Sequence, residues 1–218
     1  MNYALLFLGA DYTPFVLSGQ IWRVVMSAFL HGGLLHLGLN LYALYIVSTF
    51  IERFYGRRKV LIIYVIGAIG GSLASLLADI VGMWSSGGVE IISSMSVGAS
   101  GAIFAMVGAL IGSKLKKSTY EPQLNVDPNQ LISVVIYNLL IGVGINLVGG
   151  GVYINIWAHF GGLAAGILLG AFLSSVNSFY ESKARKIFTG ILFYGSLIFL
   201  ALSFLAQIFF ILSNIFTF

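Results

Sequence analysis

Long apolar runs, broken by short polar segments, dominate the chain. A membrane-spanning helix needs roughly 20 apolar residues, because lipid offers no hydrogen-bond partners to exposed backbone groups. The pattern therefore predicts an all-α, polytopic membrane helix bundle with about six transmembrane helices. The expected spans are 24–50, 60–83, 99–113, 131–148, 154–173 and 187–210.

The two ends of the chain differ in character. Residues 1–10 are apolar but too short to cross a bilayer, so we expect a remnant or re-entrant segment there. The last apolar run, 187–212, predicts an additional C-terminal transmembrane helix. We expect 1–218 to form a single membrane-embedded domain, with the candidate chemistry confined to 10–175.

Composition supports the membrane assignment and narrows the chemistry. The chain is 59% hydrophobic and only 8% charged, so it has too few charged side chains to cover a water-soluble domain. It contains 3 histidines and no cysteine, and these do not provide a three-ligand set at the usual zinc spacing. We therefore expect no metal and no cofactor.

The positions of the basic residues indicate which segments lie on the same side of the membrane. All of the lysines and arginines except Arg23 lie in the segments 53–59, 114–117 and 183–186, which are separated by pairs of spans. These segments must lie on one side of the membrane, and the positive-inside tendency makes that side the cytoplasm, so we expect a multi-pass protein of the plasma membrane. The net charge of +4 thus reflects orientation, and we expect no nucleic-acid partner.

This topology brings four polar side chains to one depth. The first, third and fifth spans all run from outside to inside, and His36, Asn40, Ser100 and His159 lie near their starts. His36 and Asn40 are four residues apart and project from one helix face. Polar groups inside a bilayer are costly and usually functional. The sequence therefore predicts a site in the outer part of the membrane.

We interpret Ser100 as a nucleophile and His159 as its general base. The expected positions of Asp79 and Glu90 are in loops, so a dyad without an orienting carboxylate is predicted. Small residues on both helices permit the close approach that a Ser–His hydrogen bond requires. They are Gly98, Gly101, Gly162, Gly166 and Gly170.

In this order and spacing, the motifs resemble those of the rhomboid family of intramembrane serine proteases. The resemblance covers about residues 10–175 and implies a Ser–His dyad in a water-filled cavity that opens to the outer face. It implies cleavage of transmembrane segments of other membrane proteins, so the expected partners are transmembrane protein substrates and membrane lipid. The motifs are Trp22-Arg23, His36-x-x-x-Asn40, Glu52-Arg53, Gly98-Ala99-Ser100-Gly101 and Ala158-His159-x-x-Gly162-x-x-x-Gly166.

The expected reaction assigns roles to the neighbouring groups. His36 and Asn40 side chains, with the backbone N–H groups of Ala99 and Ser100, are expected to form the oxyanion hole. Phe104 follows Ser100 by one helical turn, where its ring can stack on the His159 imidazole. Trp22 and Arg23 are expected to support the site, although such a pair is ordinarily an interfacial anchor.

Two departures from the family pattern accompany the resemblance. The first helix of the family is apparently truncated, and Asn155 stands where relatives frequently have an acid. A catalytically inactive relative that binds transmembrane clients is one alternative, and a small transporter is another, although the chain shows no convincing internal repeat. The sequence leaves the oligomeric state and the substrate open.

Overall fold

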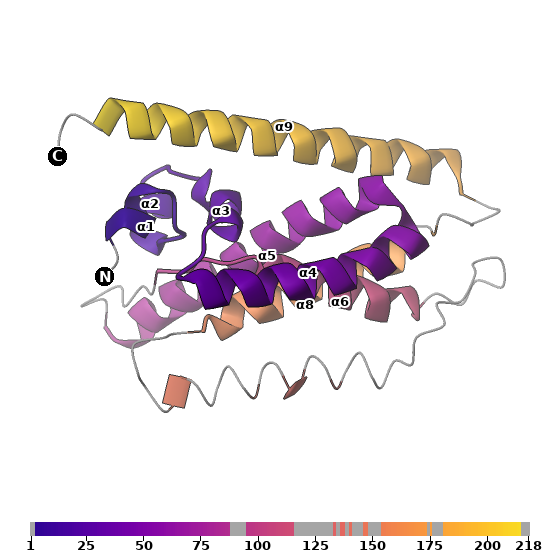
Figure 1. The fold of residues 1–218 in the computed structure, drawn as a ribbon, viewed down its shortest axis with the longest axis horizontal. Coiled ribbons are helices and arrows are strands. Elements are labelled where there is room, and N and C mark those ends of the chain that lie inside the picture. The colour runs from indigo at the N-terminus through magenta and orange to yellow at the C-terminus, as the bar shows by residue number, and fades with distance from the viewer. Residues whose placement is uncertain are drawn as a thin grey trace.

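The protein is a bundle of helices in a computed structural model that describes residues 3–87, 95–115, 154–173, 175 and 181–214, with isolated positions between 133 and 147 (Figure 1). The expected span 131–148 lies outside the described residues except for those positions. The described elements are α1 (Tyr3–Phe7), α2 (Thr13–Leu17), α3 (Arg23–Met26), the 3₁₀ helix η1 (Ser27–Phe29), α4 (Leu34–Tyr55), α5 (Arg57–Ser85), α6 (Ser100–Ser113), α8 (Ile156–Phe172) and α9 (Lys183–Asn214).

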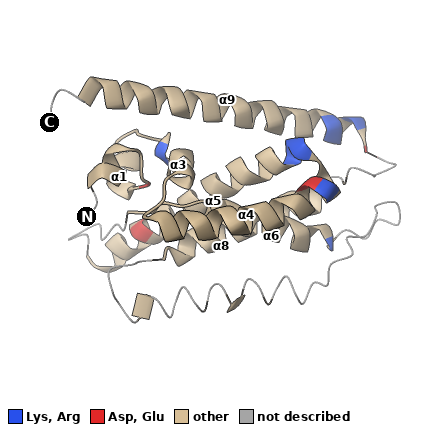
Figure 2. Cartoon of the chain, in the orientation of Figure 1, with Lys and Arg blue, Asp and Glu red and all other residues tan. Residues whose placement is uncertain are grey.

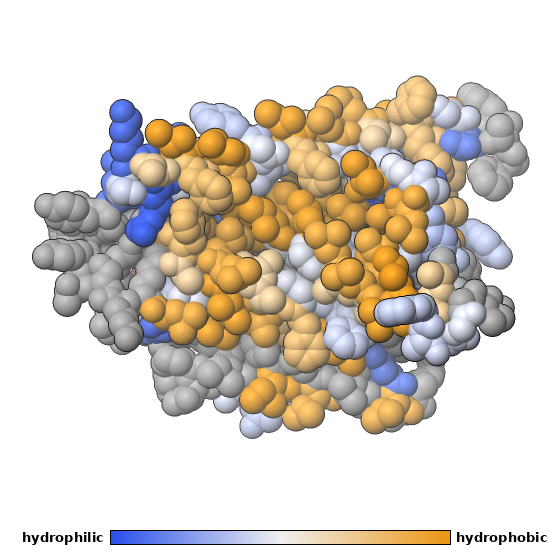
Figure 3. Space-filling model, turned by 180° about the vertical axis from the view of Figure 1, so that it is seen from behind, coloured by the Kyte–Doolittle hydropathy of each residue, from blue (hydrophilic) through white to orange (hydrophobic). Residues whose placement is uncertain are grey.

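The chain is a multi-pass membrane protein. Within the described residues, α4, α5 and α9 are long and apolar enough to cross a membrane, and α6 and α8 are shorter apolar helices. Large apolar side chains remain exposed along the long helices, and the space-filling view shows them covering much of one face of the molecule (Figure 3). This surface is suited to lipid, because contact with acyl chains incurs no hydration penalty there.

The short helix α6 is the centre of the bundle. It has 14 residues and is therefore about 21 Å long, less than the thickness of a bilayer core. Of its residues 11 are buried, mainly against α8 and α5. Ser100, the first residue of α6, is therefore recessed below the ends of the longer helices.

Backbone contact between glycine faces brings α5, α6 and α8 together. A Cβ atom on Gly162, Gly166 or Gly170 of α8 would overlap the backbone carbonyls of α6. On α5, Gly71 approaches the carbonyl of Ala158 so closely that an added Cβ would lie 2.7 Å from its oxygen. Such contacts are typical of small-residue faces in membrane helices, where close packing replaces the hydrophobic effect.

Helix α9 lies along α5 and the N-terminal helices. Its Phe210 ring is 5.6 Å from Trp22 and 5.9 Å from Phe7, measured between ring centroids. Its polar residues Ser203 and Gln207 are buried among these elements. The C-terminal helix thus covers the segment that precedes α4, and both ends of the chain lie near the same end of the bundle (Figure 1).

Most span boundaries agree with the expected ones within a few residues, but the first does not. The first expected run, 24–50, divides into two parts, because η1 ends at Phe29, the backbone of Leu30 is extended (φ −96°, ψ 149°), and α4 begins only at Leu34. The apolar residues of its first part pack inside the protein, where Val25 is fully buried. Hydropathy alone does not distinguish this burial from a lipid-facing span.

The described cations other than Arg23 collect at one end of the bundle, as the alternation of spans predicted. Figure 2 shows basic residues where α4 meets α5, where α6 ends and where α9 begins. The first residues of α6 and α8 lie toward the opposite end (Figure 1). The candidate site and the basic loops are therefore at different membrane depths.

Candidate active site

Ser100 follows a turn whose backbone conformation only glycine adopts easily. Gly98 has φ +124°, in the region that L side chains rarely occupy, and a Cβ there would lie 2.8 Å from His36 Nε2. The Gly98 N–H donates to the carbonyl of Ser27 at 3.0 Å, which ties the turn to η1. No side chain caps the start of α6, so its first N–H groups point to the space beside Ser100.

The structure brings His159 and Ser100 together. His159 Nε2 lies 2.8 Å from Ser100 Oγ, and the histidine is 8% exposed. The Phe104 ring is parallel to the imidazole within 6°, with centroids 4.3 Å apart. Among the described residues His159 Nδ1 has no hydrogen-bond partner, and no carboxylate contacts it there. The local arrangement is a serine–histidine pair stacked on an aromatic ring.

Asn155 fixes the beginning of the histidine helix. Its Oδ1 accepts a hydrogen bond from the Ala158 N–H at 3.0 Å, and its Nδ2 donates to Ser75 Oγ on α5 at 2.6 Å. Asparagine is among the preferred N-cap residues. An amide serves both contacts because it donates and accepts at once, whereas a carboxylate only accepts.

His36 and Asn40 lie on the opposite side of the serine turn. The Gly32 N–H donates to His36 Nδ1 at 3.4 Å, which leaves Nε2 as the protonated nitrogen facing Gly98. Asn40 Nδ2 donates one hydrogen to the His36 carbonyl at 2.9 Å and keeps a second hydrogen for another acceptor. Two side-chain donors from α4 are thus directed at the turn that carries Ser100.

Trp22 and Arg23 lie apart from the serine–histidine pair. Arg23 is fully buried and donates to the carbonyls of Leu6 at 2.7 Å and Ala10 at 2.9 Å, with its guanidinium 4.6 Å from the Trp22 ring. The pair is enclosed by α1, α2 and α9, unlike the exposed interfacial anchor that such a pair ordinarily forms, and its support of the site stays a prediction. It organises the chain that precedes the site.

Several residues near the site carry no signal in the sequence. Asp11 and Ser96 pair through both backbone N–H groups, at 3.0 and 2.8 Å, and the Asp11 carboxylate accepts a hydrogen bond from Ser72 of α5. Asp79, expected in a loop, lies within α5 and accepts a hydrogen bond from Thr13. Glu90 is outside the described residues. The N-terminal segment is therefore attached both to α5 and to the strand-like stretch that leads to Ser100.

Burial raises the pKa of the Asp11 carboxyl in this attachment. Asp11 lies outside the membrane-spanning helices and is 7% exposed, and burial is the main cause that raises its pKa to about 6. The neighbouring Asp79 raises the pKa further, whereas the Ser72 hydrogen bond and Arg23 lower it. Asp11 therefore changes charge in a mildly acidic range.

Fold and site together define a class of protein: a polytopic helical membrane protein with a buried serine–histidine pair at the recessed end of a short central helix. Residues 18–176 match the Rhomboid domain. The chain belongs to the rhomboid family, whose members include intramembrane serine proteases.

Relatives in several organisms support this assignment. Rhomboid-like protease 3 of Toxoplasma gondii is 34% identical over 76% of this chain and 56% of its own length. Rhomboid protease AarA of Providencia stuartii is 31% identical over 76% of this chain and 60% of its own length. RHOMBOID-like protein 5 of Arabidopsis thaliana is 33% identical over 75% of this chain and 47% of its own length. The chain thus spans about half the length of the curated relatives it matches.

Proposed function

We propose that this protein is an intramembrane serine endopeptidase that cleaves transmembrane segments of other membrane proteins with a Ser100–His159 dyad. The observation that carries the proposal is the 2.8 Å separation of Ser100 Oγ and His159 Nε2 in a buried setting. This separation suits proton transfer from a hydroxyl to an imidazole. The rhomboid proteases among its relatives favour the same reaction.

In the proposed mechanism, His159 Nε2 removes the proton of Ser100 as Oγ attacks the scissile carbonyl carbon. The C–N bond then breaks, and the same nitrogen returns the proton to the departing amine. Water then attacks the carbonyl carbon of the acyl-enzyme, and His159 takes a proton from this water. The ester bond to Oγ breaks, and His159 returns the proton to Oγ. The stack on Phe104 holds the imidazole plane in place through both steps.

Four donors are suited to the oxyanion that forms during each attack. They are His36 Nε2–H, the second hydrogen of Asn40 Nδ2, and the backbone N–H groups of Ala99 and Ser100. Removing one such donor from a water-poor site typically costs about 3 kcal/mol of transition-state stabilisation. The dipole of α6 adds favourable potential at its N-terminus.

The proposed substrates are transmembrane helices that unwind easily. A peptide carbonyl inside a helix is occupied by its own hydrogen bond, so attack requires an extended segment. Glycine or proline near small side chains weakens a helix and permits that extension. We place the cleavage site near the outer face of the plasma membrane, with the basic loops in the cytoplasm.

Labelling with a fluorescent fluorophosphonate tests the dyad. We expect purified native protein in detergent to be labelled, and Ser100→Ala and His159→Ala to lose the label. Ser113→Ala is the matched control, because this serine lies at the other end of α6 and its hydroxyl donates to the Leu110 carbonyl. A folded native protein that stays unlabelled would favour the inactive relative, and equal labelling of Ser100→Ala would remove the nucleophile from the proposal.

Cleavage in proteoliposomes tests the substrate class. A reporter with a single transmembrane helix, containing glycine and proline near its outer end, is expected to yield two fragments only with the dyad intact. Mass spectrometry of the fragments locates the broken bond. Binding of the reporter without any cleavage, at native and Ser100→Ala proteins alike, would indicate a client-binding role, and solute flux through the same proteoliposomes would indicate a transporter.

A further inference from the structure

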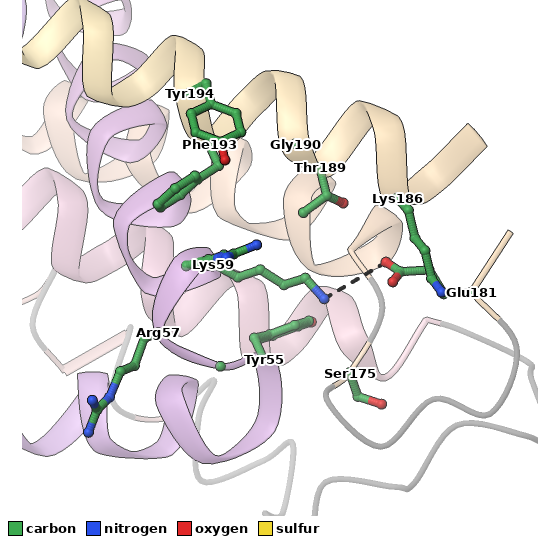
Figure 4. A pocket seen from close by; sticks show the side chains of 12 residues that line it. Tyr55, Arg57, Lys59, Ser175, Glu181, Lys186, Thr189, Gly190, Phe193 and Tyr194 are labelled. Atoms are coloured by element: carbon green, nitrogen blue, oxygen red, sulfur yellow. Dashed lines mark ion pairs between the residues drawn. The ribbon is translucent and has the colours of Figure 1, made fainter. Parts of the chain in front are cut away.

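A cavity lies at the basic end of the bundle, where α4 meets α5 and where α9 begins (Figure 4). It encloses about 640 Å³ between the turn joining α4 to α5 and the first turns of α9. Four cations and one carboxylate line it: Arg57, Arg58, Lys59, Lys186 and Glu181. The cavity is therefore a concave basic site outside the proposed catalytic centre.

Two of the four cations already have acidic partners. Arg57 pairs with Glu52 at 2.7 Å and turns away from the cavity in Figure 4, and Lys59 pairs with Glu181 at 3.9 Å. Within the part of the chain that the structure describes, Arg58 and Lys186 have no ion-pair partner. Arg58 instead lies over the Phe193 ring at 5.6 Å, which fixes its guanidinium at the cavity edge. The cavity thus has an excess of positive charge.

A buried hydroxyl adds a directional group. Thr189 Oγ1 is enclosed and has no hydrogen-bond partner among the described residues. Its side chain projects from α9 into the space that Lys59 and Lys186 also enter (Figure 4). An unpaired buried hydroxyl is costly, so an acceptor in this space is favoured.

We propose that this cavity binds a phosphate group, and that the source of the phosphate is the headgroup of an anionic phospholipid. Phosphate oxygens accept hydrogen bonds from Arg58, Lys186 and Thr189 together, and they neutralise the excess charge. The cavity lies at the basic ends of the membrane-crossing helices α5 and α9, which is the depth of the headgroups. Ile191 and Tyr194 are exposed on α9, and Tyr194 also lines the cavity, so acyl chains attached to the headgroup have large side chains to contact beside it.

Such a ligand contacts α5 and α9 at once and joins them at this end. Binding requires none of the Ser100–His159 chemistry, so this site can be tested independently of the proposed protease activity. The same cations attract a free phosphate, and the experiment therefore includes a soluble phosphate ester as a separate arm.

Native mass spectrometry of the purified protein in a neutral detergent measures the binding. The probes are phosphatidylglycerol and phosphatidylcholine with identical acyl chains, and glycerol phosphate is the soluble competitor. We expect retention of phosphatidylglycerol and little retention of phosphatidylcholine. Arg58→Gln combined with Lys186→Gln should weaken phosphatidylglycerol binding about 25-fold, since each cation near anionic lipid contributes a factor of about five.

A matched pair controls for net charge. Arg53→Gln combined with Lys183→Gln removes two exposed cations from the same end of the bundle but none from the cavity lining. This control is expected to retain the lipid. Thr189→Val keeps the shape and the charge, and its loss of binding would show a directional contact even if the double variant fails to fold.

Equal lipid retention by the double variant, Thr189→Val and the control pair would overturn the proposal. Phosphatidylcholine retained as tightly as phosphatidylglycerol would overturn it as well, because the zwitterion lacks the net negative charge. Displacement of the lipid by glycerol phosphate at a similar concentration would assign the site to a soluble phosphate and overturn the lipid source. Resistance to displacement supports the lipid.

Discussion

Gly166→Ala, which adds one methyl group to α8, should lengthen the distance between Ser100 and His159. A Cβ at this position would overlap the carbonyl oxygen of Ala105 and lie 2.6 Å from its carbonyl carbon and Cα. Ordinary van der Waals contact begins at 3.4 Å, so relieving the carbon contacts alone requires α6 and α8 to separate locally by about 0.8 Å, and the oxygen contact requires more. Overpacking of this kind costs about 1–3 kcal/mol.

The separation reaches the site because Gly166 and His159 lie on the same face of α8, about two turns apart. If the Ser100–His159 distance lengthens from 2.8 Å by a similar amount, proton transfer loses its geometry. A misplacement of about 1 Å can reduce a reaction about 100-fold. We therefore expect Gly166→Ala to lower both the midpoint of thermal unfolding in detergent and the rate of fluorophosphonate labelling.

A second glycine supplies the sharper test. On α5, a Cβ at Gly67 would overlap the Ala105 side chain, whereas the three atoms nearest to a Cβ at Gly166 belong to the Ala105 backbone. Ala105→Gly should therefore rescue Gly67→Ala but not Gly166→Ala in a double-mutant cycle. Gly195→Ala is the control, because nothing lies within 4 Å of its added Cβ. Unchanged unfolding and labelling in Gly166→Ala would refute the reasoning, as would rescue of both variants.

Three further predictions concern other contacts. Phe104→Leu should slow labelling about fivefold by removing the stack on His159, while Phe104→Tyr keeps the ring and the rate; equal rates for all three would dismiss the stack. Tyr55→Phe should lower the free energy of unfolding by about 1 kcal/mol in denaturant titration, since the Tyr55 hydroxyl lies 3.1 Å and 3.0 Å from the Ala109 and Gly170 carbonyls, and the labelling rate should not change. Asp11 has its folded-state pKa raised from 3.8 to about 6, so the folded state holds its proton more tightly than the unfolded state. Its contribution to stability is full below pH 4 and is lost as the pH rises to 6, by about 3 kcal/mol at most. The midpoint of thermal unfolding should therefore rise on acidification from pH 7 to pH 5, and Asp11→Asn should flatten this dependence; an identical pH profile in the variant would argue against it.

The convergence of polar residues was predictable because it depends on direction and depth alone. The positions of the cations give the direction of each span, and His36, Asn40, Ser100 and His159 then fall at one end. The glycine face of α8 was visible for a similar reason, since its four-residue repeat is a local pattern. The equivalent face on α5, at Gly67, Gly70 and Gly71, was visible in the same way but was missed.

Contacts between distant segments were not predictable. The burial of Arg23 could not be predicted, because the carbonyls of Leu6 and Ala10 that accept its hydrogen bonds belong to a different segment and leave no mark on the local pattern. The Asn155–Ser75 bond joins residues 80 positions apart. A single sequence records the donors and acceptors but not which of them meet.

Several of these unpredicted contacts fix the starts of the short helices α6 and α8 to neighbouring segments. The start of α6 lacks a side-chain cap, and the chain before it is fixed instead through Gly98 to Ser27 and through Ser96 to Asp11. The start of α8 is fixed through Asn155 to Ser75. Asp11 bonds to Ser72 and Asn155 bonds to Ser75, and both serines belong to α5. One long helix therefore sets the positions at which α6, with Ser100, and α8, with His159, begin. The proposed dyad has no third residue to orient its histidine among the described residues, so it needs such fixed ends: the separation of the two helix starts then determines the distance between Ser100 and His159.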